Sequence, residues 1–214
     1  LGDLAFAQSI RDLAAQGVDI IVDDITYFNE PMYQDGPIAK AVADVTAQGV
    51  TYFSSAANSN KVIGGNSVGS YETTAFRQTA CPALINTEYS PAVVSCHDFD
   101  PTGGVNPTYP FTYSGNLTYT LGWNEPAFGV TTDLDLCLLN VGLNTVRCAS
   151  SANLTTQQAF EFAAFSGSGS RAWIVVRKQG SAPRFKLISH RSDLVSVTFN
   201  TSAGGDIVGP TIFG

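Results

Sequence analysis

The apolar residues of this chain follow a helical period in its first part and a strand period in much of the rest. In residues 1–60, apolar side chains recur three and four positions apart and alternate with short continuous apolar runs, a pattern typical of helices joined to buried strands. Between about 95 and 195, short runs such as "YTLGW", "LDLCLL" and "AWIVVRK" are separated by Gly, Asn, Ser and Pro, as in antiparallel sheets. The change of period predicts two domains of different class.

The first 60 residues predict the order helix, strand, helix, strand. An apolar helical face in residues 4–14 precedes the compact strand "VDIIVDDI". The triplet Asp-Gly-Pro at 35–37 marks the start of a second helix, which ends at Gly49 before the strand "VTYFSS". Strands joined through a helix pair in parallel, and the working residues of such a sheet lie beyond the carboxyl ends of its strands. Those ends are residues 24–27 and 56–60.

The strand-rich part predicts an antiparallel jelly-roll β-sandwich over residues 95–195. A connector rich in Gly, Ser and Thr, with a short helix near residues 71–77, precedes it over 61–94. Residues 196–214 are expected to return as one more strand to the α/β domain. The predicted fold class is α/β plus all-β, a partial parallel αβαβ segment with an inserted sandwich. Because the first residues already follow the helical pattern, we expect a piece of a longer protein.

Composition and charge argue against two classes of partner. The formal net charge is -7 and the 11 Lys and Arg are scattered along the chain, whereas a nucleic-acid surface needs clustered positive charge. No uninterrupted apolar run reaches the length of a membrane span. We therefore predict neither a nucleic-acid nor a membrane partner.

The four cysteines fall into two local pairs, Cys81 with Cys96 and Cys137 with Cys148. Neither pair has the CxxC spacing of a tetrahedral metal site, so disulfides are favoured over buried thiols of a reducing compartment. Cys137 and Cys148 lie in two strand-like runs around "NVGLN", and a hairpin would place them opposite each other. Three glycosylation sequons also occur, at Asn116, Asn153 and Asn200. Both features fit a secreted, extracellular or cell-surface protein.

Three stretches of the α/β segment, "GVDIIVDDITYFNEP", "QDGPIAKAVADVTAQGV" and "TYFSSAANSN", together resemble the subtilisin-like serine proteases. In that family a strand ending in a substrate-pairing segment leads through a helix to a second strand that ends in Ala-Gly-Asn. The resemblance implies that the side chain of Asn58 helps to form the oxyanion hole. It also implies that Asp24, Ile25 and Thr26 pair with the substrate backbone.

The chain also departs from the family pattern. Ala57 replaces the usual Gly before the Asn, and Thr26 replaces a Gly of the pairing segment, although Ser55 and Ala57 are small enough to leave room for a substrate side chain. The Asp, His and Gly-Thr-Ser motifs of the catalytic triad are absent, and neither His97 nor His190 has a family-like context. The resemblance therefore implies part of a secreted endopeptidase that cleaves polypeptides through an acyl-enzyme, with no activity of this chain alone.

The later stretches "TLGWNEPAFGVTTDLDLCLLN" and "AFEFAAFSGSGSRAWIVVRK" resemble the small β-sandwich domains found beside or within secreted bacterial proteases, related to pre-peptidase C-terminal modules. This resemblance implies a sandwich inserted in the catalytic domain. The alternative is a pseudoprotease or adhesive protein, in which the sandwich binds protein or glycan and the α/β segment is a scaffold.

Other motifs allow a functional and a structural interpretation. Residues 65–69 match G-x-S-x-G, but their flanks favour a flexible loop over a hydrolase nucleophile turn. Asp133 and Asp135 share one side of a strand, where they either face solvent or, with Asp98 or Asp100, bind a structural Ca²⁺; we expect the solvated face and no cofactor. We expect His97 and His190 to lie at the surface or in loops. Trp123 and Trp173 lie in strand patterns, so we expect them to pack in the core.

Overall fold

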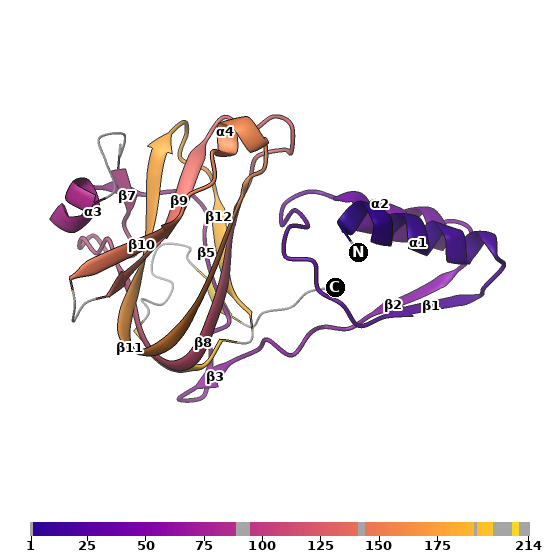
Figure 1. Cartoon of the computed structure of the whole chain (residues 1–214), viewed down its shortest axis with the longest axis horizontal. Helices are drawn as coiled ribbons and strands as arrows, with labels where there is room; N and C mark the ends of the chain where they lie inside the picture. Colours follow the sequence, from indigo (N-terminus) through magenta and orange to yellow (C-terminus); the bar gives the residue numbers. More distant parts are fainter. Residues whose placement is uncertain (1, 89–94, 141–143, 191, 199–206, 210–214) are drawn as a thin grey trace. The chain divides into compact units, whose positions relative to one another are not determined.

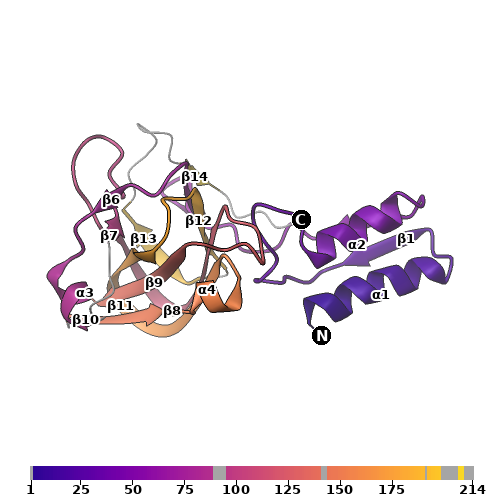
Figure 2. The same ribbon diagram turned by 90° about the horizontal axis from the view of Figure 1, so that it is seen from above.

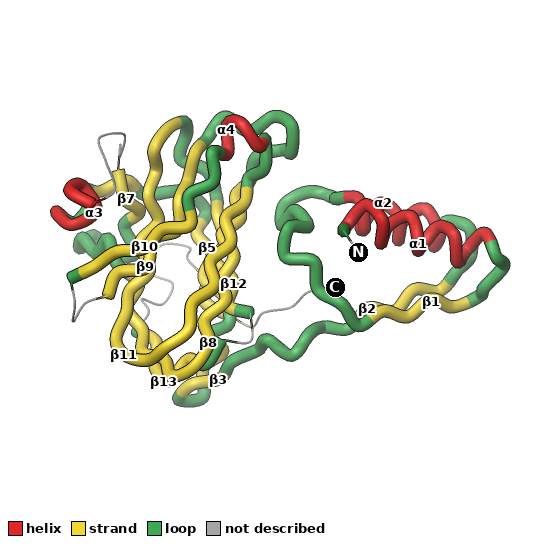
Figure 3. Tube along the Cα trace, viewed as in Figure 1, coloured by secondary structure: helices red, strands yellow, loops and turns green. Residues whose placement is uncertain are grey.

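The computed structural model describes residues 2–88, 95–140, 144–190, 192–198 and 207–209. Two compact units are present, an α/β unit within residues 1–58 and a β unit within Ser59–Thr211. Figure 3 shows long helices in the α/β unit and mainly strands in the β unit. The chain thus combines a small mixed unit with a large antiparallel one.

The α/β unit contains two helices and two strands in alternation. They are α1 (Asp3–Ala15), β1 (Ile20–Asp23), α2 (Pro37–Thr46) and β2 (Thr51–Ser54). The strands pair in parallel, with Ile20 opposite Thr51 and Asp23 opposite Ser54. The predicted element order and the parallel pairing are confirmed.

Both helices pack on the same face of the strand pair (Figure 1). The small core between them consists of Ala7, Ile10, Ile21, Ala41 and Val45. The residues that alternate with Ile21 along β1 point the other way, as the period of two requires. One face of the sheet is therefore covered and the other is not.

The second helix starts where the sequence predicts, but its N-terminus is completed by a distant side chain. Gly36 precedes Pro37 and supplies no side-chain cap. Instead, Glu30 accepts a hydrogen bond from the N–H of Ala39 at 3.0 Å, and burial raises the pKa of this carboxyl group. A Cβ at Gly36 would lie 2.5 Å from the Glu30 carboxylate, so the glycine makes room for this contact.

The β unit contains twelve described strands and two short helices. They are β3 (Val62–Ile63), β4 (Asn66–Ser67), β5 (Ser70–Thr73), β6 (Gln78–Thr79), α3 (Ala83–Glu88), β7 (Ser95–His97), β8 (Tyr109–Trp123), β9 (Asp133–Asn140), β10 (Thr145–Ala149), α4 (Asn153–Thr156), β11 (Phe160–Gln179), β12 (Phe185–Ser189), β13 (Leu194–Val197) and β14 (Ile207–Gly209). All but β3 and β4 belong to one antiparallel sheet, with the main order β10-β9-β11-β8-β12-β5-β14.

The long strands β8 and β11 curl the sheet around its core (Figure 2). Near the middle of their pairing, Gly115 lies opposite Gly167, and both have positive φ values, 131° and 139°. Glycine in a strand interior permits such a bend because it has no Cβ to clash. The antiparallel, strand-rich class predicted for this part is confirmed, and its strands form one continuous curled sheet.

The curled sheet has a concave inner face and an outer face, and both are packed along β9. Leu134 and Leu136 point into the main core, which also holds Trp123 and Trp173. Their neighbour Cys137 points outward, into a second cluster with Ile174 and Val176. The two tryptophans are thus core residues, as predicted.

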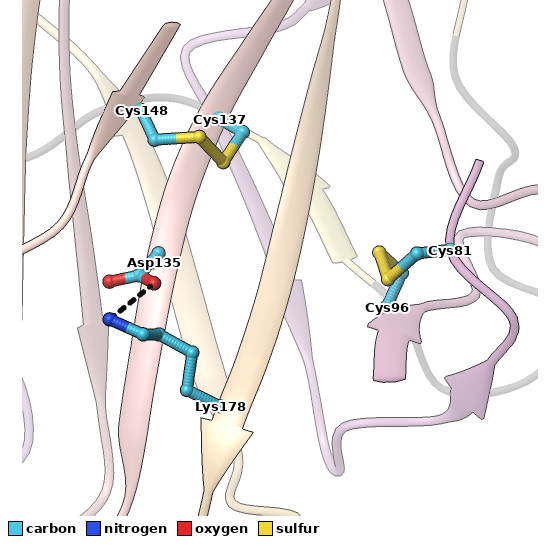
Figure 4. Close-up of a disulfide and its surroundings, with 6 residues drawn as sticks. All are labelled: Cys81, Cys96, Asp135, Cys137, Cys148 and Lys178. Atoms are coloured by element: carbon cyan, nitrogen blue, oxygen red, sulfur yellow. Dashed lines mark ion pairs between the residues drawn. A yellow bond between two sulfur atoms is a disulfide. The ribbon is translucent and has the colours of Figure 1, made fainter. Parts of the chain in front are cut away.

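Both predicted disulfides are present. Cys81 bonds to Cys96, and Cys137 bonds to Cys148 (Figure 4). Cys137 and Cys148 face each other in the register of β9 with β10, which confirms the hairpin. Within the described part of the chain, no cysteine is free.

Removing the hairpin disulfide is expected to destabilise the β unit. The bond closes a loop with a sequence separation of 11 residues, and the chain-entropy model gives about 3 kcal/mol for a loop of this size. We expect the double variant Cys137→Ser, Cys148→Ser to lose about that amount in urea unfolding followed by circular dichroism. An unchanged free energy of unfolding would mean that the hairpin is fixed by its pairing alone.

Three local expectations need correction. Residues 70–73 form a strand of the sheet, whereas the sequence predicted a connector with a short helix near 71–77. The G-x-S-x-G motif lies in and after the β3–β4 hairpin, whose turn residues Gly64 and Gly65 have positive φ values of 58° and 82°, as a two-residue hairpin turn requires. Residues 196–214 were expected to return to the α/β domain. Instead, β13 pairs with β8 and β14 pairs with β5, both in the large sheet of the β unit. The parts of the expected return segment at 199–206 and 210–214 lie outside the described residues.

Candidate functional site

The candidate site lies at one edge of the α/β unit. Asp24, Ile25 and Thr26 follow β1, and residues 55–58 follow β2. The parallel ladder continues one step beyond the strands, because the N–H of Ser55 donates to the carbonyl of Asp23 at 3.2 Å. All six predicted site residues therefore follow the carboxyl ends of two adjacent parallel strands, where α/β folds place their ligand sites.

A partly exposed group of hydrogen bonds connects the ends of the two strands. Asp23 accepts a hydrogen bond from the hydroxyl of Ser54 at 2.8 Å and another from the phenol of Tyr52. Burial, and then the hydrogen bond to this carboxylate, raise the pKa of Tyr52 far above its usual value. Asp23 is not among the residues predicted from the sequence; the spacing of Tyr52 and Ser54 on one side of β2 was the available indication.

The backbone at Ala57 is left-handed. Its φ is 62°, a conformation that costs a non-glycine residue about 1 kcal/mol. Glycine adopts this backbone conformation without strain.

Asn58 follows directly and its side chain is exposed. Its amide makes no side-chain hydrogen bond with any residue of the described ranges. The amide N–H groups are therefore available as donors at the sheet edge. On the neighbouring segment, Asp24 and Ile25 are exposed and Thr26 is half-buried.

The two histidines are buried in the β unit, so the expected surface positions are wrong, although His190 does lie in an irregular segment. His97 lies within β7; its Nδ1 accepts the N–H of Arg77 at 3.1 Å, and its Nε2 lies 2.9 Å from the hydroxyl of Tyr71. His190 follows β12 and lies 2.8 Å from the hydroxyl of Thr120, and burial lowers its pKa to about 4. Both imidazoles form hydrogen bonds in the interior of the β unit.

The strand carboxylates are also more buried than predicted. The Nζ of Lys178 lies 3.5 Å from Asp135 and 3.9 Å from Asp133, and Figure 4 shows this lysine reaching toward Asp135 from the neighbouring strand. Asp135 is fully buried, so the solvated-face interpretation was wrong for it. Asp98 accepts the N–H groups of Asp100 and Asn106. Among the described residues, no three His, Cys, Asp or Glu side chains gather as a metal site.

A further buried carboxylate, Glu161, was not anticipated. Its Oε1 accepts the N–H of Ser151 and the amide of Asn153, each at 2.9 Å. Burial raises its pKa to about 7. Asn153 is itself fully buried, which leaves its sequon inaccessible in the folded chain, whereas Asn116 is exposed; Asn200 lies outside the described residues.

Glu161 is expected to make stability depend on pH. Its pKa is 4.5 in the unfolded chain and about 7 in the folded one, so the folded state retains the proton while the unfolded state releases it. Stability is fully present below pH 4.5 and is lost as the pH rises through 7. The wild type should therefore lose free energy of unfolding as the pH rises, whereas the isosteric Glu161→Gln should not. Because one pKa unit corresponds to about 1.4 kcal/mol, the stability of Glu161→Gln relative to the wild type should increase by about 2 kcal/mol from pH 5 to pH 8.

Urea unfolding of both proteins at the two pH values measures this gain. Parallel pH dependence of the wild type and Glu161→Gln would show that the carboxyl group titrates normally in the folded protein.

No protein-family model matches the chain, and the search of curated proteins finds no match either. The described helices are all too short or too polar to cross a membrane. The two disulfides are consistent with an extracellular protein.

Proposed function

We propose that the α/β unit is a segment of the catalytic domain of a secreted subtilisin-like serine endopeptidase. The observation that carries the proposal is the uncovered face of the strand pair. Ile20, Val22 and Phe53 are exposed by 59, 71 and 56%, although parallel sheets are normally covered on both faces. In a doubly wound catalytic domain, further elements of the protease cover this face and extend the sheet.

The sheet edge supplies two functions of such an enzyme. The amide of Asn58 donates a hydrogen bond to the oxyanion of the tetrahedral intermediate, and the segment at 24–26 pairs with the substrate backbone. The left-handed backbone at Ala57 supports this assignment, because the family places Gly there. Ser55 and Ala57 border the substrate side chain.

The remaining chemistry belongs to the intact protein. A serine nucleophile and its histidine base form the acyl-enzyme there, with a polypeptide as substrate. The β unit is the inserted jelly-roll sandwich of this arrangement, with the two halves of its curled sheet as the opposed layers. The two disulfides support a secreted enzyme, because such bonds persist in oxidising compartments.

Labelling with a serine-directed suicide reagent tests the proposal. The 214-residue chain is expected to take up no label, because it has no triad, whereas the intact product of its gene is expected to take up one equivalent and to cleave peptides. Stoichiometric labelling of the 214-residue chain would contradict the proposal. So would an intact protein that is inert to both reagent and peptides, which would leave the α/β unit as the scaffold of a binding protein.

A further inference from the structure

The concave face of the curled sheet ends in a cavity of about 260 Å³. It lies wholly within the β unit, between residues of β8, β9, β10 and β11. Its apolar surface comes from Tyr113, Leu138 and Phe165, which continue the inner face of the sheet. Asn140 and Thr145 add an amide and a hydroxyl group. The cavity thus combines an aromatic floor with hydrogen-bonding walls, as small-ligand sites do.

One wall is formed by Arg171, which the protein holds in place. Its Nη1 donates to Asn140 Oδ1 at 3.0 Å and to the carbonyl of Ser170 at 2.9 Å, and its Nη2 donates to the carbonyl of Ser168 at 3.2 Å. The guanidinium also lies over the ring of Tyr113, 5.6 Å from its centroid. These contacts leave the Nε–H and one Nη2–H without an acceptor among the described residues.

The second cation, Arg147, has no such support. It lines the cavity from β10 and is exposed, and it makes no hydrogen bond or ion pair with any residue the structure describes. The chain carries a formal net charge of -7, yet none of the described residues that line this cavity has a carboxylate. Two cations without a carboxylate among these lining residues favour the binding of an anion.

We propose that this cavity binds a carboxylate-bearing sugar residue. Arg147 takes the carboxylate through its fork of N–H donors, and Arg171 adds to the positive potential of the wall. The C–H face of the sugar ring packs on Phe165, while Asn140 and Thr145 bond its hydroxyl groups. The volume is below that of drug-sized sites and fits a single small ring. The site lies in the β unit alone, so the proposal does not depend on the protease assignment.

Isothermal titration calorimetry of the full 214-residue chain tests this site with three probes: glucuronate, glucose and inorganic phosphate. We expect binding of glucuronate and neither detectable binding of glucose nor comparable binding of phosphate. Because hydrogen bonds to a charged group are the stronger kind, Arg147→Gln should weaken glucuronate binding about tenfold or more. The matched control is Arg184→Gln, which removes another exposed arginine of the β unit, paired with Glu72, and should bind as the wild type does.

Three results would overturn the proposal. Glucose binding as tightly as glucuronate would remove the role of the carboxylate, and phosphate binding as tightly would remove the role of the sugar. Equal binding by Arg147→Gln, with an unchanged melting temperature, would show that the cavity is not the site.

Discussion

Replacing Asn58 by Ala in the proposed intact protease is expected to lower kcat about a hundredfold or more and to change KM little. The amide is proposed to meet the oxyanion only as the tetrahedral intermediate forms, so its loss affects the transition state and leaves substrate binding intact. The expected magnitude, about 3 kcal/mol, is the one measured for an oxyanion-hole Asn in a subtilisin. Steady-state hydrolysis of a peptide substrate gives both constants.

The matched control is Asn60→Ala. Asn60 is an exposed residue of the same irregular segment, two positions later, and its replacement should leave kcat within a few-fold of the wild type. Equal losses in both variants, or a loss confined to KM, would assign the effect at Asn58 to the conformation of the segment.

Replacing Trp173 by Ala is expected to cause the largest loss of stability. The indole is fully buried and packs against Tyr119, Phe111 and Phe165, with ring centroids 4.8, 5.7 and 6.1 Å away. Truncation of such a core aromatic costs about 3–5 kcal/mol, since transfer and cavity terms add. For a unit of this size we expect the melting temperature of the β unit to fall by about 10 °C.

Phe128 provides the comparison for this prediction. It is 91% exposed, so Phe128→Ala should change the free energy of unfolding by no more than about 0.5 kcal/mol. Thermal unfolding followed by near-ultraviolet circular dichroism distinguishes the two variants. A loss below about 1 kcal/mol for Trp173→Ala would show that the described core is not the one the protein forms.

The elements that the sequence predicts well are those governed by period and by local pairing. The helical and strand periods of the first 60 residues suffice for the parallel order, because two buried strands joined by a helix have few other arrangements. Cys137 and Cys148 are close in sequence and flank a turn, so their register follows from the hairpin. In both cases a short connection, a single helix or a single turn, limits the possible pairings.

Burial of the charged residues was not predictable in the same way. Asp135 alternates with leucines along β9, and the alternation correctly separates the two faces of the strand. It cannot show that the outer face is also covered, because that covering depends on residues from other strands, such as Cys96 and Ile174. The face of β9 that carries Asp133 and Asp135 was therefore predicted to be exposed to solvent, although Asp135 is buried.

Glu161 shows a stronger version of the same effect. It lies between Phe160 and Phe162, so alternation alone would place the phenylalanines inside. The structure buries Glu161 and leaves Phe162 partly exposed, because Ser151 and Asn153 supply hydrogen bonds to the carboxylate. These partners lie ten and eight residues earlier in the chain, outside the strand whose alternation is used for the prediction.

The residues of the candidate site were identified only through a resemblance. Spacing alone places them after two strands, and the structure adds the shared edge and the left-handed backbone at Ala57. Asp23, which ties the strand ends, went unnoticed because its partners Tyr52 and Ser54 lie on the other strand.

A crystal structure of the intact protein with a peptide aldehyde or boronic acid bound as a transition-state analogue would test the proposed oxyanion hole. We expect the Asn58 amide nitrogen about 2.7–3.1 Å from the tetrahedral oxygen, with the inhibitor backbone paired along residues 24–26. An inhibitor bound elsewhere, or an Asn58 side chain directed away from the bound tetrahedral group, would contradict it.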